Sequence, residues 1–197
     1  MGSSLEPPPL SREFFGRPAV TVARELLGCV LVSECGGERT SGVVVETEAY
    51  VGPEDPASHA ARSIGRTGRN DPMFGPPGTA YVHMNYGIHW LLNAVTDAEG
   101  YPAAVLIRAL APLDGRDVMQ QRRGRSELTN GPARLAQALA IDADRQRHPL
   151  DRAPLWLGSG VPVPEEQVVR TTRVGITRGT QRDLRFYDDR SRWVSRR

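Results

Sequence analysis

The sequence predicts a single α/β domain, of the α+β kind, and three observations support this fold class. The chain has 197 residues, a length typical of one domain with a substantial hydrophobic core. Two regions each contain a pair of apolar segments joined by a glycine-containing turn, as β-hairpins do. Apolar residues at helical spacing lie before the first hairpin and after the second. The sequence shows no internal repeat and no second domain.

The composition is that of a globular protein without membrane-spanning segments. The hydrophobic fraction is 39%, and no apolar run approaches the roughly 20 residues of a transmembrane helix. Residues 1–10 lack the pattern of a secretory signal and are expected to form a flexible leader to a folded domain at residues 11–197. Cys29 and Cys35 are too few for a disulfide framework, so we expect reduced thiols in a cytoplasmic protein.

The basic residues are unusual in kind. All 25 are arginine, and the formal net charge is +2, which neither requires nor excludes a nucleic-acid partner. A coding preference for GC-rich codons alone explains the absence of lysine. Whatever its origin, this composition makes every side-chain cation a planar guanidinium, which suits phosphate and carboxylate groups.

The N-terminal part of the chain predicts two helices and a hairpin. Ser11 is placed to cap a short helix, and a second helix with Pro18 in its first turn ends at Gly28. Strands over residues 29–33 and 41–47 then form a hairpin around a pair of glycines.

A long loop is predicted over residues 52–79, which show no periodicity and are rich in Gly, Pro, Arg and Ser. Loops of this length inside a domain are usually functional or disordered. Arg62, Arg66 and Arg69 suit the loop to phosphate contacts, and a merely solvated loop is the alternative.

The second hairpin, over residues 81–93, depends on the length of its turn. A two-residue turn at Tyr86 would put Asn93 on the face opposite Tyr81 and His83. A three-residue turn puts all three side chains on one face, and we expect this arrangement. The hairpin rings could also be core residues, but a ring at the turn is poorly placed for core packing.

The C-terminal half adds helices and strands. A polar helix is predicted over residues 113–125. The next helix begins after Gly131 with Pro132 in its first turn, and its free N–H groups suit a phosphate. Short strands are expected over residues 171–177 and 184–187.

Arg108 is the strongest physical clue to a functional site. It follows five apolar residues (103–107), so its guanidinium is expected near the core, where a buried cation requires a partner. Glu46 and Glu48 are the candidate partners, and they share one strand face with Tyr50 if their strand extends that far. The alternative is a solvated charge at a strand end.

The two glutamates allow more than one chemistry. Glu48 with Tyr50 and His59 resembles a carboxylate in an aromatic pocket, and a structural ion pair is the alternative. A divalent metal bound with Asp55 or His59 is also open, although no recognised ligand spacing supports it. Paired carboxylates further suggest a carbohydrate hydrolase. The sequence has no P-loop, dinucleotide fingerprint or zinc-type cysteine pair, so no metal and no cofactor are expected.

Ordered motifs extend over the chain from Phe14 to Ser195. They occupy residues 18–20, 23–24, 27–28, 45–55, 68–70, 73–74, 77–79, 86–87, 106–110, 131–132, 137–141, 173–175 and 184–187. Together they resemble the 3-methyladenine (alkyladenine) DNA glycosylase family of the mammalian type, which also occurs in bacteria. The resemblance implies a compact α/β domain with a curved, mainly antiparallel sheet and surrounding helices.

The resemblance also implies a function. The expected reaction is hydrolysis of the N-glycosidic bond of alkylated or deaminated purines that are flipped out of duplex DNA, without a cofactor. The expected partner is double-stranded DNA with damaged purines, bound by a monomer in the bacterial cytoplasm at the nucleoid. Because the chain has no lysine to form a Schiff base with the sugar, a monofunctional enzyme is expected.

Residue by residue, the resemblance assigns roles to matching positions. Glu48 matches the general base that activates water, Arg108 the arginine that orients both, and the Val174 carbonyl a further water contact. Tyr86 matches the wedge that fills the vacated base stack. The base pocket is implied at Tyr50, His59 and Asn93, with Asn93 disfavouring guanine. Tyr81 and His83 are added to the expected pocket because the three-residue turn puts them on the same face as Asn93. Contacts to the DNA backbone are expected from Arg62, Arg66, Arg69, Arg122, Arg123, Gly131 and Arg134.

One position departs from the family, because His83 stands where tyrosine is common. Imidazole stacks less area than phenol and can titrate, so the resemblance leaves the substrate range and the pH behaviour open. The loop after His59 is also a residue longer, which leaves Arg62 and Arg66 without a simple alignment. Two other classes stay open: a non-catalytic DNA-damage-binding protein, which would not need Glu48, and a carbohydrate glycoside hydrolase, which would not need DNA.

Overall fold

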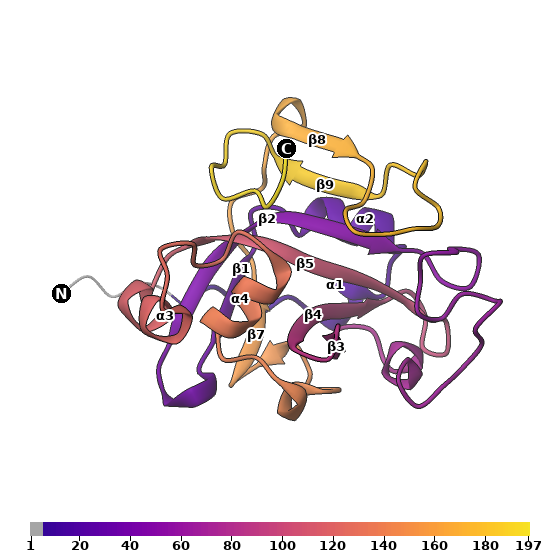
Figure 1. The fold of residues 1–197 in the computed structure, drawn as a ribbon, viewed down its shortest axis with the longest axis horizontal. Coiled ribbons are helices and arrows are strands. Elements are labelled where there is room, and N and C mark those ends of the chain that lie inside the picture. The colour runs from indigo at the N-terminus through magenta and orange to yellow at the C-terminus, as the bar shows by residue number, and fades with distance from the viewer. Residues whose placement is uncertain (1–5) are drawn as a thin grey trace.

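A curled antiparallel sheet organises the fold (Figure 1). The computed structural model describes residues 6–197, and every strand pairing in that part of the chain is antiparallel. The strands are β1 (Val30–Ser33), β2 (Thr40–Tyr50), β3 (Ala80–Asn85), β4 (His89–Thr96), β5 (Ala103–Pro112), β6 (Asp151–Arg152), β7 (Leu155–Gly158), β8 (Val168–Thr171) and β9 (Arg185–Asp188). Their main order is β3-β4-β5-β2-β1-β7-β6, and a β8-β9 hairpin joins β2. The predicted fold class is confirmed.

Helices lie around this sheet. They are α1 (Arg12–Phe15), α2 (Ala19–Glu25), α3 (Arg116–Arg123) and α4 (Pro132–Ala138), with short 3₁₀ turns at Cys35–Gly37, Asp71–Phe74, Ala143–Arg145 and Glu165–Gln167. As predicted, α2 follows Pro18 and the chain turns at Gly28, whose φ of +91° favours glycine. A Cβ atom at Gly28 would lie 2.0 Å from the Val161 carbonyl oxygen, so the turn from α2 into β1 requires glycine.

Strand β2 is central, and its two edges are used differently. One edge pairs with β5, while the other pairs with β1 over residues 40–43 and with β9 over residues 46–48. The β2–β5 register shifts on both sides of Glu46, and Arg108 of β5 has no Cα partner there. Such irregularities bend a strand and re-aim its side chains. Here they accompany the convergence of Arg108 with acidic residues of β2.

Alternation along the strands gives the sheet two unlike faces, because successive side chains point to opposite sides. One face contributes to the main core together with α2, and its members include Ala49, Val82, Leu92, Val105 and Ile107. The other face carries predicted site residues, namely Glu48, Tyr50, Tyr81, His83, Asn93 and Arg108. The apolar face thus supports a polar one from behind.

Two strand predictions need correction. The strand predicted over residues 171–177 is wrong, since β8 ends at Thr171 and the chain then leaves the sheet. Two residues beyond this end, the buried Arg173 guanidinium binds the Asp55 carboxylate, so this segment follows the ion pair and not the sheet. The sequence does not predict β6 and β7 because their apolar run is too short to distinguish from a loop. The polar helix is also shorter than predicted, since α3 lies between two glycines with left-handed φ.

The predicted leader is ordered in part. Residues 1–5 lie outside the described part of the chain. Residues 7–10 are not a free leader: the Leu10 N–H donates to the Leu157 carbonyl at 2.8 Å, and Pro9 forms a β-bridge with Gly158. This segment therefore lies along β7. No helix among residues 6–197 is long and apolar enough to cross a membrane.

Candidate active site

An open cleft of about 750 Å³ lies on the polar face of the sheet. Its lining brings together eight residues that the sequence singled out, namely Tyr50, His59, Tyr81, His83, Tyr86, Asn93, Arg108 and Val174. The register confirms the three-residue turn, because Asn85 pairs with His89 and Tyr81 lies directly opposite Asn93. Residues from β2, β3, β4, β5 and the segment after β8 therefore meet in one place.

Glu48 lies just behind the wall of this cleft and has no exposed surface. Its Oε1 accepts a hydrogen bond from the Val174 N–H at 2.7 Å and lies 3.3 Å from Nη1 of Arg108. Its Oε2 accepts a hydrogen bond from the Tyr50 hydroxyl at 3.0 Å. Burial raises the pKa of Glu48 above its ordinary value, and these three neighbours oppose that shift. Within the described part of the chain Oε2 accepts from Tyr50 alone, so it has the larger remaining capacity to accept a proton.

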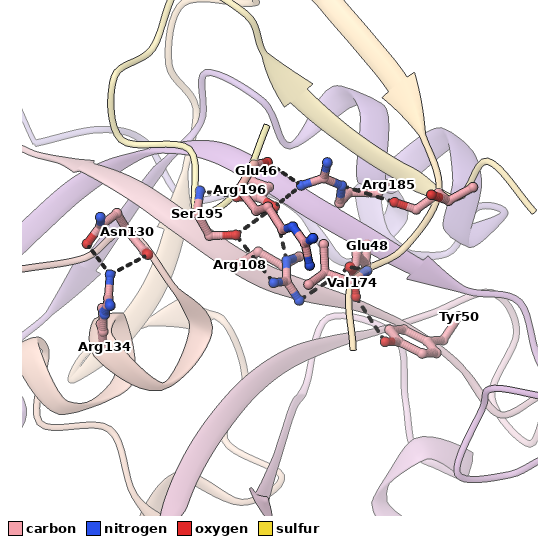
Figure 2. A network of polar contacts seen from close by, with 11 residues as sticks. Glu46, Glu48, Tyr50, Arg108, Asn130, Arg134, Val174, Arg185, Ser195 and Arg196 are labelled. Atoms are coloured by element: carbon pink, nitrogen blue, oxygen red, sulfur yellow. Dashed lines mark hydrogen bonds and ion pairs between the residues drawn. The ribbon is translucent and has the colours of Figure 1, made fainter. Parts of the chain in front are cut away.

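Arg108 is buried, as its sequence context predicts, and it contacts both candidate glutamates (Figure 2). Its Nε donates to Oε1 of Glu46 at 3.1 Å, while Nη1 faces Glu48. Nη1 of Arg185 on β9 reaches the same Glu46 oxygen at 2.8 Å. Two buried carboxylates are therefore balanced by two buried guanidiniums, which is the condition for keeping such charges away from water. The alternative of a solvated strand end is wrong for Arg108.

A second buried ion pair adjoins Tyr50. Nη2 of Arg173 lies 2.7 Å from Oδ1 of Asp55, and the Arg173 guanidinium lies 4.7 Å from the centre of the Tyr50 ring. Burial disfavours the ionised form of Asp55, but the hydrogen bonds and charge of Arg173 outweigh this and lower the pKa of Asp55. Arg173 directly precedes Val174, so this pair fixes the segment that supplies the Val174 N–H to Glu48.

These contacts bear on the metal alternative. Asp55 forms an ion pair with Arg173, and His59 contacts the Tyr81 hydroxyl. Neither side chain is therefore arranged with Glu46 and Glu48 around a common point where a metal ion could bind. Among residues 6–197 no group of three or more His, Cys, Asp or Glu side chains is placed to hold a metal ion.

The aromatic wall is fixed by its own hydrogen bonds. The Tyr81 and His83 rings stack with centroids 5.0 Å apart, and Nδ1 of His59 lies 2.8 Å from the Tyr81 hydroxyl. Nδ2 of Asn93 donates to the Tyr81 carbonyl at 3.0 Å and lies 3.2 Å from Nδ1 of His83. Because the carbonyl bond identifies Nδ2 as the donor, Nδ1 of His83 must accept and the proton sits on Nε2. Burial, with His59 and Arg69 nearby, lowers the pKa of His83 to about 3.

Exposed residues form the rim of the cleft. Tyr86 occupies the tip of the β3–β4 turn with 84% of its surface exposed, and it lines the cleft mouth. In the long loop, Arg66 binds Asp71 at 2.6 Å and Arg69 donates to the Met84 carbonyl at 3.0 Å. Arg62, in the same loop, pairs with Glu54. All three loop arginines remain on the surface.

The α3–α4 region gives a different result for one predicted DNA contact. The Arg122 guanidinium donates to the carbonyls of Ala138 and Cys35, both at 3.1 Å, and ties the two helices to the turn after β1. It is therefore a structural residue and is withdrawn as a candidate phosphate contact. Arg134 is exposed on α4 and bonds Asn130. The half-buried Arg123 and buried Gly131 lie in the same region.

Sequence reasoning missed several residues of the site. Arg173 and Ser195 gave no local signal, because their partners lie 118 and 149 residues away in the chain. Arg185 could have been found by the clue that identified Arg108, since it stands between the apolar Leu184 and Phe186. The exposed Arg178 at the cleft rim was also not singled out.

Comparison with known proteins shows which proteins this chain is similar to. A family model described as "Methylpurine-DNA glycosylase (MPG)" matches residues 13–192. Three curated relatives carry the name "Putative 3-methyladenine DNA glycosylase". The protein of Gloeobacter violaceus is 50% identical, over 95% of this chain and 86% of its own length. Those of Salinibacter ruber and Carboxydothermus hydrogenoformans are 45% and 47% identical, over 95% of this chain and 96% and 99% of their own lengths.

The neutral state of His83 leads to a prediction for folding stability. The unfolded chain protonates this imidazole near its ordinary pKa of 6.5, whereas the folded protein holds it neutral until about pH 3. Stability is therefore greatest above about pH 6.5 and decreases as the pH falls through this window. His83→Phe should reduce the loss of unfolding free energy between pH 7 and pH 5 by on the order of 1 kcal/mol.

Denaturant unfolding at the two pH values measures this effect. His89→Phe is the matched control, since His89 is an exposed histidine on the same hairpin. NMR of the ring nitrogens gives an independent check, and titration of His83 between pH 5 and pH 7 would contradict its lowered pKa.

Proposed function

We propose a mechanism for this chain, which belongs to the methylpurine-DNA glycosylase family and is a DNA glycosylase for the repair of alkylated bases. It binds duplex DNA and flips out one damaged purine. It then hydrolyses the N-glycosidic bond of that purine with Glu48 as the general base. The observation that carries this proposal is a buried carboxylate held by Arg108, the Val174 N–H and Tyr50 directly behind an aromatic cleft. We further propose alkylated and deaminated purines as substrates.

Base flipping follows from the shape of the site. A base inside a duplex is unreachable, and extruding it costs a few kcal/mol of stacking and pairing. We assign Tyr86 to fill the vacated space, because an exposed ring at a turn tip can enter the stack without leaving a core. The flipped base would lie between Tyr50 and the wall formed by His59, Tyr81 and His83, where rings supply stacking area.

The chemical step is assigned to two buried charged side chains, those of Glu48 and Arg108. Oε2 of Glu48 accepts a proton from water, and the Val174 carbonyl gives that water a second contact. Arg108 keeps the glutamate oriented, since its Nη1 faces Oε1, the oxygen that does not take the proton. N3- and N7-alkylated purines carry positive charge and leave readily, so a general base in a dry pocket suffices for them.

Specificity and binding are assigned to the surrounding residues. Asn93 is held by two hydrogen bonds in the cleft wall, so it would crowd the exocyclic amine of guanine. Phosphate contacts are proposed for Arg62, Arg66, Arg69, Arg123, Gly131 and Arg134, and Arg178 is added to them. Guanidinium–phosphate contacts supply sequence-independent affinity for DNA. We propose that the enzyme acts as a monomer in the cytoplasm, at the nucleoid when bound.

Glu48→Gln should abolish base release, because an amide cannot take a proton from water but keeps the size of the side chain. We expect a rate loss of at least about a hundredfold in single-turnover release of 3-methyladenine or hypoxanthine. In the wild type the rate should fall on the acid side at a pH above the ordinary glutamate value of 4.5, because burial raises the pKa of Glu48.

Glu54→Gln is the control for that substitution, since Glu54 is exposed and pairs only with a loop arginine. Equal release by wild type and Glu48→Gln would remove Glu48 from catalysis and favour a damage-binding protein. Turnover of a simple glycoside without DNA would instead favour a carbohydrate hydrolase.

Tyr86→Ala should weaken binding to lesion DNA while leaving the thermal midpoint nearly unchanged. The side chain is 84% exposed, so its removal costs little packing, whereas loss of the wedge removes on the order of 1–3 kcal/mol of stacking. Lesion-DNA affinity and the unfolding midpoint are measured on the same samples. A large fall in midpoint with unchanged affinity would return Tyr86 to a structural role.

The enzyme should leave an intact abasic strand. Strand cleavage by a glycosylase needs an amine that forms a Schiff base with the sugar, and this chain has no lysine side chain. Arginine cannot replace it, because its guanidinium stays protonated. Borohydride reduction during turnover on lesion DNA should therefore trap no protein–DNA adduct. A trapped adduct would contradict the proposal and point to the N-terminal amine as nucleophile.

A further inference from the structure

A short C-terminal segment enters the charge network behind Glu48 (Figure 2). The Ser195 N–H donates to Oε2 of Glu46 at 2.6 Å, and its hydroxyl donates to Oε1 at 2.9 Å. Nη2 of Arg108 donates to the same hydroxyl at 3.3 Å. The Arg196 carbonyl accepts from Arg185 at 2.7 Å. Neither Ser195 nor Arg196 lines the cleft, and the proposed chemical step uses neither residue.

The two glutamates of this network do not have the same arginine partners. Among residues 6–197, Arg108 is the one guanidinium that contacts both carboxylates, whereas Arg185 contacts Glu46 and not Glu48. Glu46 therefore competes with Glu48 for Arg108. Ser195 reduces that competition, because it supplies two hydrogen bonds to Glu46 that Arg108 would otherwise have to replace.

We propose that Ser195 is a positioning residue, which satisfies Glu46 and orients Arg108 so that this arginine stays shared with Glu48. The inference deepens the proposed function and rests on Glu48 as the general base. In this view Glu46 holds Arg108 in place through its ion pair with the Arg108 Nε. Ser195 satisfies part of the hydrogen-bonding capacity of Glu46, so Glu46 attracts Arg108 less strongly away from Glu48.

The proton affinity of Glu48 depends on how Arg108 is shared between Glu46 and Glu48, so its measurement tests the proposed role of Ser195. The groups that face Glu48 come from several elements: Glu46 and Tyr50 from β2, Arg108 from β5, and Arg173 with the Val174 N–H from the segment after β8. Of these, Ser195 touches Glu46 and Arg108 directly. Loss of the hydroxyl should draw Arg108 towards Glu46 and make ionised Glu48 less stable.

The test is Ser195→Ala. The acid limb of the single-turnover pH–rate profile should move upward by about 0.5 pH unit, which is roughly a threefold lower rate on that limb. The rate on the alkaline plateau should stay close to that of the wild type. Ser195→Thr keeps a hydroxyl and should restore the wild-type profile. Ser191→Ala is the matched control, because Ser191 caps the Trp193 N–H in the same segment and does not touch either glutamate.

Carboxyl ¹³C NMR of the DNA-free protein measures the same shift without relying on activity. The Glu48 signal is assigned from its loss in Glu48→Gln. An upward shift in Ser195→Ala, absent in Ser195→Thr and Ser191→Ala, supports the inference. No shift, a downward shift, or an equal loss of rate at every pH would overturn it.

Glu46→Gln should shift the pKa of Glu48 in the opposite direction from Ser195→Ala. Removing this charge should release Arg108 to Glu48, so the Glu48 titration should move to lower pH. An upward shift in this variant would overturn the inference. The proposed function fails on different evidence, namely a wild type that releases no damaged base or a Glu48→Gln enzyme with full activity. In either case the NMR titrations still decide the role of Ser195.

Discussion

The sharing of one buried guanidinium, that of Arg108, between Glu46 and Glu48 is the interaction on which the site depends. A buried cation without a partner costs several kcal/mol, so the three side chains are stable only when they are assembled together. Their strands carry the register shift beside Glu46, and Arg185 of β9 balances the second negative charge. Assembly of the sheet and assembly of the charged site are therefore one event.

Buried ion pairs are weak contributors to stability, because desolvation offsets most of their attraction. Two of them nevertheless lie beside Glu48: Arg108 with Glu46, and Arg173 with Asp55. Apolar side chains of similar volume would fill the same space at little cost. What they could not do is fix the Val174 N–H and the Tyr50 ring relative to a carboxylate. We infer that these pairs are retained for position, and that the apolar core on the other face of the sheet provides the stability.

The sequence predicted features that depend on local patterns. Five apolar residues before Arg108 indicated burial, and the three-residue turn placed Asn93 beside Tyr81, because strand alternation is fixed by spacing. Contacts between distant segments could not be predicted in this way. Arg173 finds Asp55, and Arg122 finds the carbonyl of Cys35, only once the sheet has brought them together. An arginine has the same local signal whether it will bind a phosphate or a buried carbonyl.

The aromatic wall of His59, Tyr81 and His83 carries no positive charge on its His83 ring at the place where a substrate would enter. If a cationic alkylpurine stacks against His83, a protonated imidazole would repel it, and burial together with the Asn93 hydrogen bond keeps that ring neutral. The same hydrogen bond leaves the proton on Nε2, which makes the ring a donor without making it a cation. A neutral deaminated purine gains nothing from the absence of charge, so it depends more on such hydrogen bonds. The neutral state of His83 therefore matters most for the cationic lesions among the proposed substrates.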